Sequence, residues 1–200
     1  MDDKRYGRHV PVSSDCEDLI LVTPDDEEIG YLSKAACHDG EGVLHRAFSL
    51  FVFASDGSVL LQQRAADKRL WPGFWSNSCC SHPRRGESMT EAIERRAAEE
   101  LGVGLRGLEY LYKFQYHARF GEAGSEHELC WVFLSRTDDT PRPNPHEIEN
   151  WQWCAPDALD RALDETPETI TPWCRAEWRR LREEFAGRVA RYTGLSSREA

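Results

Sequence analysis

The chain has 200 residues, carries a net charge of -10, and is 40% hydrophobic and 30% charged. These values predict one soluble globular domain and exclude a chain that is disordered throughout. The acidic balance argues against a nucleic-acid partner. No apolar run approaches the roughly 18 residues of a membrane span, so we expect no membrane partner.

Cysteine usage bears on the cellular compartment. The chain contains seven cysteines, an odd number. Residues 1–5 carry charges with no apolar run behind them, so no secretory signal is predicted. An odd count without an export signal argues against a disulfide framework. We expect reduced thiols in a cytoplasmic protein that is a monomer or a weak homodimer.

The first part of the chain predicts paired strands. Residues 1–15 show no anchoring pattern, and we expect them to be flexible. β-branched and aromatic residues, with turn residues between them, predict strands at 18–23, 28–32, 46–54 and 58–63. Asp56-Gly57, between the last two of these segments, is a strong hairpin signal.

The clearest predicted helix covers residues 88–101. Ser88 and Glu91 have the spacing of a capping box, and Gly102 suits the position after the last turn. Apolar residues recur at the spacing of one buried face, namely Ile93, Ala97 and Leu101.

The second half of the chain mixes strands and helices. Strands are predicted at 108–116 and 128–136 on either side of a loop at 120–125, and at 148–154. Helices are predicted at 156–163 and 172–192, and the tail at 193–200 is expected to be mobile. The pattern predicts an α+β fold with a mixed sheet covered by helices, in a single domain at 16–192.

One segment concentrates reactive groups. Residues 76–83 read Ser-Asn-Ser-Cys-Cys-Ser-His-Pro, so Cys80 and His82 lie two positions apart. A thiol near a cation or a metal can have a lowered pKa, which makes Cys80 the best nucleophile or acid–base candidate among the thiols. The alternative is an inert buried thiol. Glu128 could be its carboxylate partner, and Tyr116 is a phenol that could orient Glu128.

The histidines and two glutamates supply candidate metal ligands. Glu126 and Glu128 alternate across His127 at the start of a strand, so their carboxylates point the same way. Three imidazoles and these two carboxylates would suit Zn²⁺, Mn²⁺ or another borderline divalent ion. The full candidate set is His38, His45, His82, Glu126 and Glu128. A lone His is more often a surface or hydrogen-bonded residue, and no local metal signature joins these positions.

Four basic residues could together neutralise a diphosphate. They are Lys34, Arg64, Lys68 and Arg96. Arg gives bidentate contacts to phosphate oxygens and Lys gives a point charge. Taken singly, a residue of this kind is more often a solvated surface charge.

Taken in order, these segments resemble type 1 isopentenyl-diphosphate isomerase, a family with a Nudix-like fold. The resemblance runs from about Ile20 to Trp173. It includes Leu-His-Arg-Ala-Phe-Ser at 44–49, Trp-Pro-Gly-Phe-Trp at 71–75, Asn-Ser-Cys-Cys-Ser-His-Pro at 77–83, Gly-Glu-Ser at 86–88, Arg-Arg at 95–96, Glu-Glu-Leu-Gly at 99–102, Glu-His-Glu at 126–128 and Thr-Pro-Trp at 171–173.

The resemblance implies an activity and roles for named residues. Isopentenyl diphosphate and dimethylallyl diphosphate would be interconverted by adding a proton on one face of the substrate and removing another on the opposite face. Cys80 and Glu128 match the acid–base pair, and Tyr116 matches the phenol that supports the carboxylate. Trp173 matches an indole that can stabilise the developing cation.

The resemblance also implies two metal sites and a substrate site. The five candidate ligands match a divalent metal site that could hold Mn²⁺, Zn²⁺ or Mg²⁺. A Mg²⁺ ion bound with the substrate diphosphate would be held by Glu100 and the backbone carbonyl of Cys80. The partner is thus a small allylic or homoallylic diphosphate, and the four basic residues match its contacts.

The chain departs from the pattern of hydrolytic Nudix enzymes at two positions. Ser81 occupies the first glycine position, and Arg96 replaces the first glutamate of the Arg-Glu pair. An Arg there removes a Mg²⁺ ligand and supplies a diphosphate contact, which favours an isomerase. The alternatives are a Nudix-type nucleoside diphosphate hydrolase and a non-catalytic binding module stabilised by metal.

Overall fold

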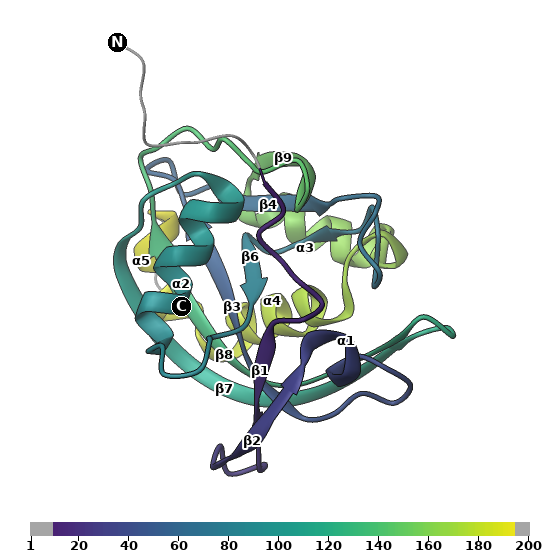
Figure 1. The fold of residues 1–200 in the computed structure, drawn as a ribbon. Helices are drawn as coiled ribbons and strands as arrows, with labels where there is room; N and C mark the ends of the chain where they lie inside the picture. The colour runs from purple at the N-terminus through teal and green to yellow at the C-terminus, as the bar shows by residue number, and fades with distance from the viewer. Residues whose placement is uncertain (1–9, 195–200) are drawn as a thin grey trace.

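The computed structural model describes residues 10–194. A nine-stranded mixed sheet forms the centre of the fold, and helices cover both of its faces (Figure 1). The predicted α+β class, with a mixed sheet between helices, is confirmed.

Strand β3 is the central strand of the sheet. The strands are β1 (Asp18–Val22), β2 (Glu28–Ser33), β3 (His45–Phe53), β4 (Val59–Arg64), β5 (Trp75–Ser76), β6 (Cys79–Ser81), β7 (Arg106–Phe120), β8 (Gly124–Arg136) and β9 (Ile148–Cys154). β3 runs parallel to β8 and antiparallel to β1, β4 and β6. β7 extends the sheet beyond β8, and β9 and β5 both pair with β4.

The helices divide between the two faces. They are α1 (Lys34–Cys37), α2 (Met89–Arg96), α3 (Pro156–Glu165), α4 (Pro172–Glu184) and α5 (Ala186–Thr193), with a π-helical turn at Ala97–Leu101 and a 3-10 turn at Pro167–Thr169. α2 packs on one face and α4 lies behind the sheet in the same view (Figure 1).

Alternate residues of β3 feed two separate cores. On one face, Phe48 and Leu50 pack with Ile93 from the α2 side. On the other face, Phe51 packs against Trp178 of α4, with ring centroids 5.8 Å apart. Because successive strand residues point to opposite faces, a strand buried on both sides must be apolar nearly throughout, as β3 is.

Most predicted elements are present, with three differences. Ser88 and Glu91 form the predicted capping box, although the helix ends in a π-helical turn. The loop predicted at 120–125 is present but shorter, at 121–123, because β7 continues to Phe120 and β8 begins at Gly124. The single helix predicted at 172–192 is wrong, because it breaks at Phe185 into α4 and α5.

The two ends of the chain fall partly outside the described residues. We expected residues 1–15 to be flexible and the tail at 193–200 to be mobile. Residues 1–9 and 195–200 lie outside the described range. Within it, Val12 and Ser13 accept hydrogen bonds from Arg96, and Ser13 donates one to Glu147. Over residues 10–194, no helix is both long enough and apolar enough to span a membrane.

Candidate active site

The register of the strands beside β3 gathers the candidate acid–base groups. His45 of β3 lies opposite Glu128 of the parallel strand β8. Tyr116 of β7 lies opposite the same Glu128 from its other side. Across the other edge of β3, Ser49 lies opposite Cys80 of β6. Because directly opposed strand residues are near neighbours, the register makes Glu128 adjacent to both an imidazole and a phenol.

The predicted metal ligands lie together, and each of them is buried. One ligand atom from each lies within 4.8 Å of the others in the group His38, His45, His82, Glu126 and Glu128. The group draws on the end of α1, on β3, on the segment after β6 and on β8. Residues far apart in the sequence therefore converge here because their strands are paired.

Backbone contacts fix two of the imidazole rings. Nδ1 of His38 lies 2.6 Å from the carbonyl oxygen of Lys34, and Nδ1 of His45 lies 2.7 Å from that of Val43. A carbonyl oxygen can only accept, so each Nδ1 carries a ring proton, and in the neutral ring Nε2 keeps a free lone pair. A metal-binding histidine is commonly held in this way.

Two contacts inside the cluster fit a metal ion better than a hydrogen bond. Nε2 of His45 lies 3.1 Å from Nε2 of His82. Oε2 of Glu126 lies 2.8 Å from Nε2 of His38, yet it makes no hydrogen bond and is fully buried. Imidazole nitrogens and carboxylate oxygens that converge in this way suit a divalent ion of the Zn²⁺ or Mn²⁺ kind.

Burial and neighbouring charges set the protonation of the cluster. Burial lowers the pKa of His82 well below its usual range, and the nearby His45 and Lys34 lower it further. Burial also opposes the charged form of His38, but the carboxylate of Glu126 raises its pKa above the ordinary value. The His82 ring is thus neutral at pH 7, the form that binds a metal.

A close approach at Gly124 ties β8 to the His38 segment. Gly124 has a φ of 135°, and a Cβ atom added there would lie 2.1 Å from the carbonyl oxygen of His38. The next residue, Ser125, donates a 3.0 Å hydrogen bond to that oxygen. Only glycine fits, so this contact helps to place Glu126 beside His38.

Glu128 is held from two sides. Oε2 accepts a 2.6 Å hydrogen bond from the Tyr116 hydroxyl, and Oε1 lies 3.2 Å from Nε2 of His82. Burial would raise the pKa of Glu128, but His45 and the Tyr116 hydroxyl bring it below its ordinary value. Burial, together with Glu128, raises the pKa of Tyr116 well above its usual range, so the phenol remains a donor.

Cys80 is a protonated thiol with two polar neighbours. Its Sγ donates to Oδ1 of Asn77 at 2.9 Å and lies 3.1 Å from Oγ of Ser49. Burial raises its pKa well above the usual range, and the nearby Glu177 raises it further. The thiol is therefore uncharged at neutral pH and has a proton to give.

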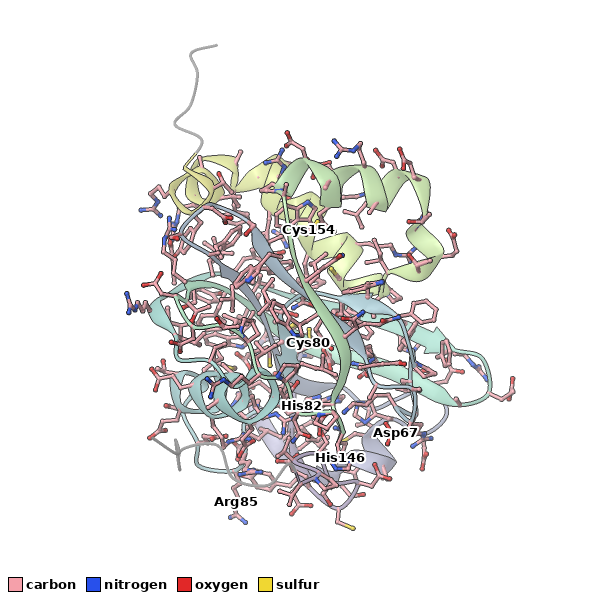
Figure 2. The ribbon with its side chains drawn as sticks, turned by 90° about the horizontal axis from the view of Figure 1, so that it is seen from above. Asp67, Cys80, His82, Arg85, His146 and Cys154 are labelled. Atoms are coloured by element: carbon pink, nitrogen blue, oxygen red, sulfur yellow. The ribbon has the colours of Figure 1, made fainter. Side chains whose placement is uncertain are left out.

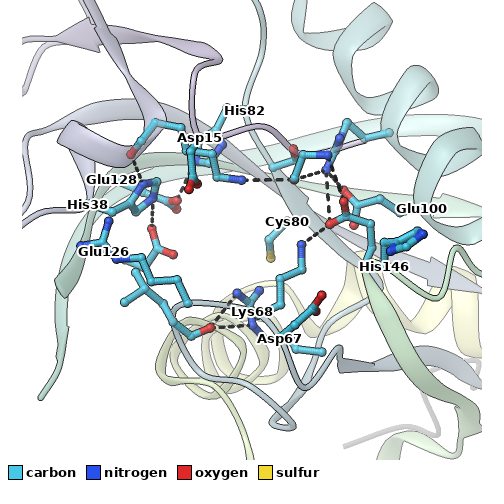
Figure 3. Close-up of a pocket in the computed structure, with 18 of the residues that line it drawn as sticks. Asp15, His38, Asp67, Lys68, Cys80, His82, Glu100, Glu126, Glu128 and His146 are labelled. Carbon is cyan, nitrogen blue, oxygen red and sulfur yellow. Dashed lines mark hydrogen bonds and ion pairs between the residues drawn. The ribbon is translucent and has the colours of Figure 1, made fainter. Parts of the chain in front are cut away.

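Cys80 faces a pocket of about 280 Å³. In Figure 3 its sulfur lies between two groups, with His38, Glu126 and Glu128 on one side and Glu100 and Lys68 on the other. His82 is buried and Cys80 is half-buried, whereas Arg85 is exposed and projects at the edge of the molecule in Figure 2.

Trp173 forms an aromatic wall of this pocket. It is 3% exposed, and its Nε1 donates a 3.0 Å hydrogen bond to Oγ of Ser76. Its ring lies edge-on to Trp71, with centroids 5.1 Å apart, and 6.3 Å from the ring of Tyr116. A buried indole held in this way offers π density to a cation without admitting water.

Lys68 and Arg96 lie at the Glu100 end of the pocket, and Lys34 lies near them and also near His82 of the metal cluster (Figure 3). Nη2 of Arg96 lies 2.5 Å from Oε1 of Glu100, and Lys68 pairs with Glu147. Burial lowers the pKa of Lys34, and the positive charges of Lys68 and Arg96 lower it further. Repulsion among cations would be relieved by an anion, so this end of the pocket suits a diphosphate.

Arg64 faces the pocket but already has backbone partners. Its guanidinium donates to the carbonyl oxygens of Leu70 and Trp71, and its Cζ lies 5.4 Å from the centroid of the Trp173 ring. Of the predicted site residues, all but His45 line one pocket, and His45 lies buried in the adjoining metal cluster. Arg64 also orders the loop that carries Trp71.

Three residues beside the site carried no signal in the sequence analysis. Ser13 Oγ lies 3.2 Å from Nζ of Lys34, and Glu147 pairs with Lys68. Glu177, of α4, is fully buried close to Cys80. Each reaches the site through tertiary contacts, and none lies at a spacing that marks a known site.

The fold and the site agree with comparisons to known proteins. The family model described as NUDIX domain matches residues 43–174. A structure described as DR0079 from Deinococcus radiodurans superposes with a TM-score of 0.67 at 27% identity, covering 82% of this chain and 98% of that one. A MutT protein from Methanosarcina mazei gives a TM-score of 0.57 at 19% identity, covering 71% and 95%. The chain belongs to the Nudix family.

Curated relatives define the kind of Nudix protein. Isopentenyl-diphosphate Delta-isomerase 1 of Photorhabdus laumondii is 42% identical over 163 residues, which cover 81% of this chain and 93% of the relative. Isopentenyl-diphosphate Delta-isomerase of Saccharopolyspora erythraea is 41% identical, covering 80% and 84%. Within the Nudix family, the chain is therefore a member of the isopentenyl-diphosphate Delta-isomerases and an enzyme of that kind.

Proposed function

We propose that this enzyme interconverts isopentenyl diphosphate and dimethylallyl diphosphate, with Cys80 and Glu128 as its acid–base pair. The observation that carries the proposal is the pocket itself. A protonated thiol and a carboxylate line one cavity, with an aromatic wall and a group of buried and half-buried cations beside them. The reaction needs a proton to be added at one carbon and another removed nearby, so it needs two such groups.

Each member of the pair has a partner suited to proton transfer. The half-buried Cys80 thiol is protonated and can donate. Glu128, with its pKa held low, is ionised and can accept, while Tyr116 holds the oxygen that takes part. Because the reaction is reversible, the two groups exchange these roles in the opposite direction. A well-placed general acid or base typically contributes about 10²- to 10⁴-fold in rate.

Trp173 would stabilise the cation that forms between the two proton transfers. An alkene is a weak base, so its protonation gives a tertiary carbocation-like species of high energy. The π face of an indole attracts a cation by about 0.5 to 2 kcal/mol, more where water is excluded. The wall from Trp173, with Trp71 packed against it, would also keep away water that would capture the cation.

Two divalent ions would complete the site. The His/Glu cluster would hold one, Zn²⁺, Mn²⁺ or Mg²⁺, which would supply a positive charge beside Glu128 and fix its orientation. Glu100 and the carbonyl of Cys80 would hold Mg²⁺ with the substrate diphosphate. Oε1 of Glu100 is buried and pairs with Arg96 at 2.5 Å, so Mg²⁺ would bind beside this ion pair. Lys34, Arg64, Lys68 and Arg96 would bind the remaining phosphate charge.

Isotope incorporation tests the proposal directly. The enzyme is incubated with isopentenyl diphosphate and Mg²⁺ in D₂O, and we expect dimethylallyl diphosphate that contains deuterium. Cys80→Ala and Glu128→Gln should each lower kcat at least about 10²-fold while circular dichroism stays unchanged. The exposed residues Cys16 and Glu122 provide matched controls, Cys16→Ala and Glu122→Gln. Release of phosphate without isomerisation would show a hydrolase instead.

A further inference from the structure

Ser13 is a pocket residue that the proposed mechanism does not use. Every second residue of this segment lines the pocket, namely Pro11, Ser13 and Asp15, as in an extended chain whose successive side chains point to opposite sides. In Figure 1 the dark purple segment that leads into β1 runs across the front of the molecule. The segment thus forms part of the pocket wall, although no sequence motif marks it.

Backbone contacts hold Ser13 in place. Arg96 donates a 3.0 Å hydrogen bond to the carbonyl oxygen of Val12. The backbone N–H of Ser13 donates a 3.0 Å hydrogen bond to Oε1 of Glu147, a buried carboxylate that also pairs with Lys68. Neither contact uses the Ser13 side chain, so the residue is positioned independently of its hydroxyl group. A ligand that met this hydroxyl would bind a group that is already ordered.

The Ser13 hydroxyl accepts from two cations. Its Oγ lies 3.2 Å from Nζ of Lys34 and 3.1 Å from Nη2 of Arg96. A hydroxyl oxygen has two acceptor lone pairs and one hydrogen, whereas ammonium and guanidinium groups can only donate. Both lone pairs are therefore taken, and among residues 10–194 the hydroxyl hydrogen has no acceptor. That hydrogen is available to an anion bound by the same two cations.

We propose that Ser13 is a substrate-binding residue whose hydroxyl donates a hydrogen bond to a phosphate oxygen of the diphosphate. The proposal rests on the proposed function, because it takes Lys34 and Arg96 to bind that anion. The two cations would neutralise charge, and the hydroxyl would add a donor of fixed direction. A hydrogen bond to a charged acceptor is stronger than one between uncharged groups, so the contact favours the bound state.

A different role for the hydroxyl predicts the opposite result. If its oxygen served only to accept from Lys34 and Arg96 in the empty pocket, a diphosphate would have to compete with it for these donors. Removing the hydroxyl would then tighten anion binding or leave it unchanged. If the hydroxyl donates to the anion, removing it weakens binding. The sign of the change therefore separates the two roles.

Isothermal titration calorimetry with inorganic pyrophosphate and Mg²⁺ tests the contact in the whole enzyme. Ser13→Ala should raise Kd about tenfold, as expected for one lost hydrogen bond to a charged group. Ser13→Thr keeps the hydroxyl and should stay within about twofold of wild type. Ser14→Ala is the matched control, because Ser14 is exposed and its Oγ accepts from the backbone N–H of Cys16 rather than from a cation. Equal or tighter binding in Ser13→Ala would overturn the proposal.

Steady-state kinetics with isopentenyl diphosphate provide a second readout. The diphosphate keeps its charge while the double bond moves, so the hydrogen bond is equally strong in the ground state and the transition state. Ser13→Ala should therefore raise KM about tenfold while kcat changes less than about twofold. A fall in kcat at unchanged KM would show that Ser13 acts on the acid–base groups instead, and would overturn the proposal.

Binding and turnover together separate this proposal from the proposed function. Weaker pyrophosphate binding in Ser13→Ala, without isomerisation by wild type, would contradict the isomerase and leave the Ser13 contact intact. Isomerisation by wild type, with unchanged binding in Ser13→Ala, would overturn the Ser13 contact alone. A wild type that binds no pyrophosphate would overturn both the contact and the diphosphate site. The variant should fold, because Ser13 lies outside the helices and strands and alanine keeps the backbone contact to Glu147.

Discussion

The Tyr116 hydroxyl donates a 2.6 Å hydrogen bond to Oε2 of Glu128, and the two residues lie opposite each other on β7 and β8. The other carboxylate oxygen, Oε1, faces His82 of the metal cluster. One carboxylate thus belongs to two environments. Its cluster-facing oxygen suits a ligand, and its phenol-facing oxygen suits an acid–base group.

The first prediction concerns this hydrogen bond. Tyr116→Phe keeps the ring in the aromatic stack with Phe114, with centroids 5.5 Å apart, and removes only the hydroxyl. We expect kcat to fall about 10- to 100-fold, because Glu128 loses the donor that orients its reacting oxygen. KM should change little, because the hydroxyl lies away from the basic end of the pocket. Steady-state kinetics with isopentenyl diphosphate check this, and an unchanged kcat would contradict it.

Trp173 supports a second prediction about the cation. Trp173→Phe keeps an aromatic face, whereas Trp173→Leu keeps only an apolar wall. We expect the Leu variant to lose about tenfold more kcat than the Phe variant, since a cation–π contact contributes about 1 to 2 kcal/mol in a dry site. Both lose the hydrogen bond to Ser76, so that loss cancels in the comparison. Equal kcat values for the two variants would show that the ring serves only to exclude water.

Metal removal gives a third prediction. Chelation followed by dialysis should lower Tm, because an ion that binds only the folded state stabilises it by about 2.7 kcal/mol at a concentration 100-fold above Kd. Restoring Zn²⁺ or Mn²⁺ should restore Tm. His45→Asn, at a fully buried ligand, should bind less metal by elemental analysis, whereas His117→Asn, outside the cluster, should bind as much as wild type. Equal metal content in the two variants would contradict the assignment.

Local signals in the sequence predicted much of the fold. Two of these signals depend only on residues close together in the sequence, and both are present in the structure: the capping box of Ser88 and Glu91, and the hairpin at Asp56-Gly57. The break at Phe185 was not predictable in this way. Phe185 stacks on Tyr112, with centroids 5.0 Å apart, and that ring comes from a distant strand. Gly187, a poor helix former, follows closely.

The candidate site likewise combines residues that local sequence signals predict with residues that only long-range contacts bring together. Cys80 and His82 share one segment and could be selected directly, but the parallel register that joins β3 to β8 is a long-range property. Only that register explains why His45 meets Glu128. The resemblance to the isomerase family already implied that His45 and Glu128 bind the same metal ion. Glu177 belongs to no motif, so only tertiary contacts place it beside the site.

The last prediction concerns stability and pH away from the active site. Glu109 of β7 anchors α5: its carboxylate pairs with Arg188 and Arg191, the latter at 2.6 Å, and accepts a 2.9 Å hydrogen bond from Tyr192. Burial would raise its pKa, but these three partners hold it below the ordinary value. The stabilisation is therefore present above the ordinary glutamate pKa, roughly 4.3, and is lost as the pH falls through the lower folded value.

Glu109→Gln should consequently lower the free energy of unfolding by about 1 kcal/mol at pH 7. The difference from wild type should shrink as the pH falls below about 4, because protonation then gives wild type the same uncharged group. Urea denaturation at several pH values measures it, with the exposed residue Glu122 as a control in the variant Glu122→Gln. Partly exposed ion pairs are screened by salt, so high salt should also reduce the difference. A difference that stayed constant down to pH 3 would show that Glu109 acts by shape and packing rather than by charge.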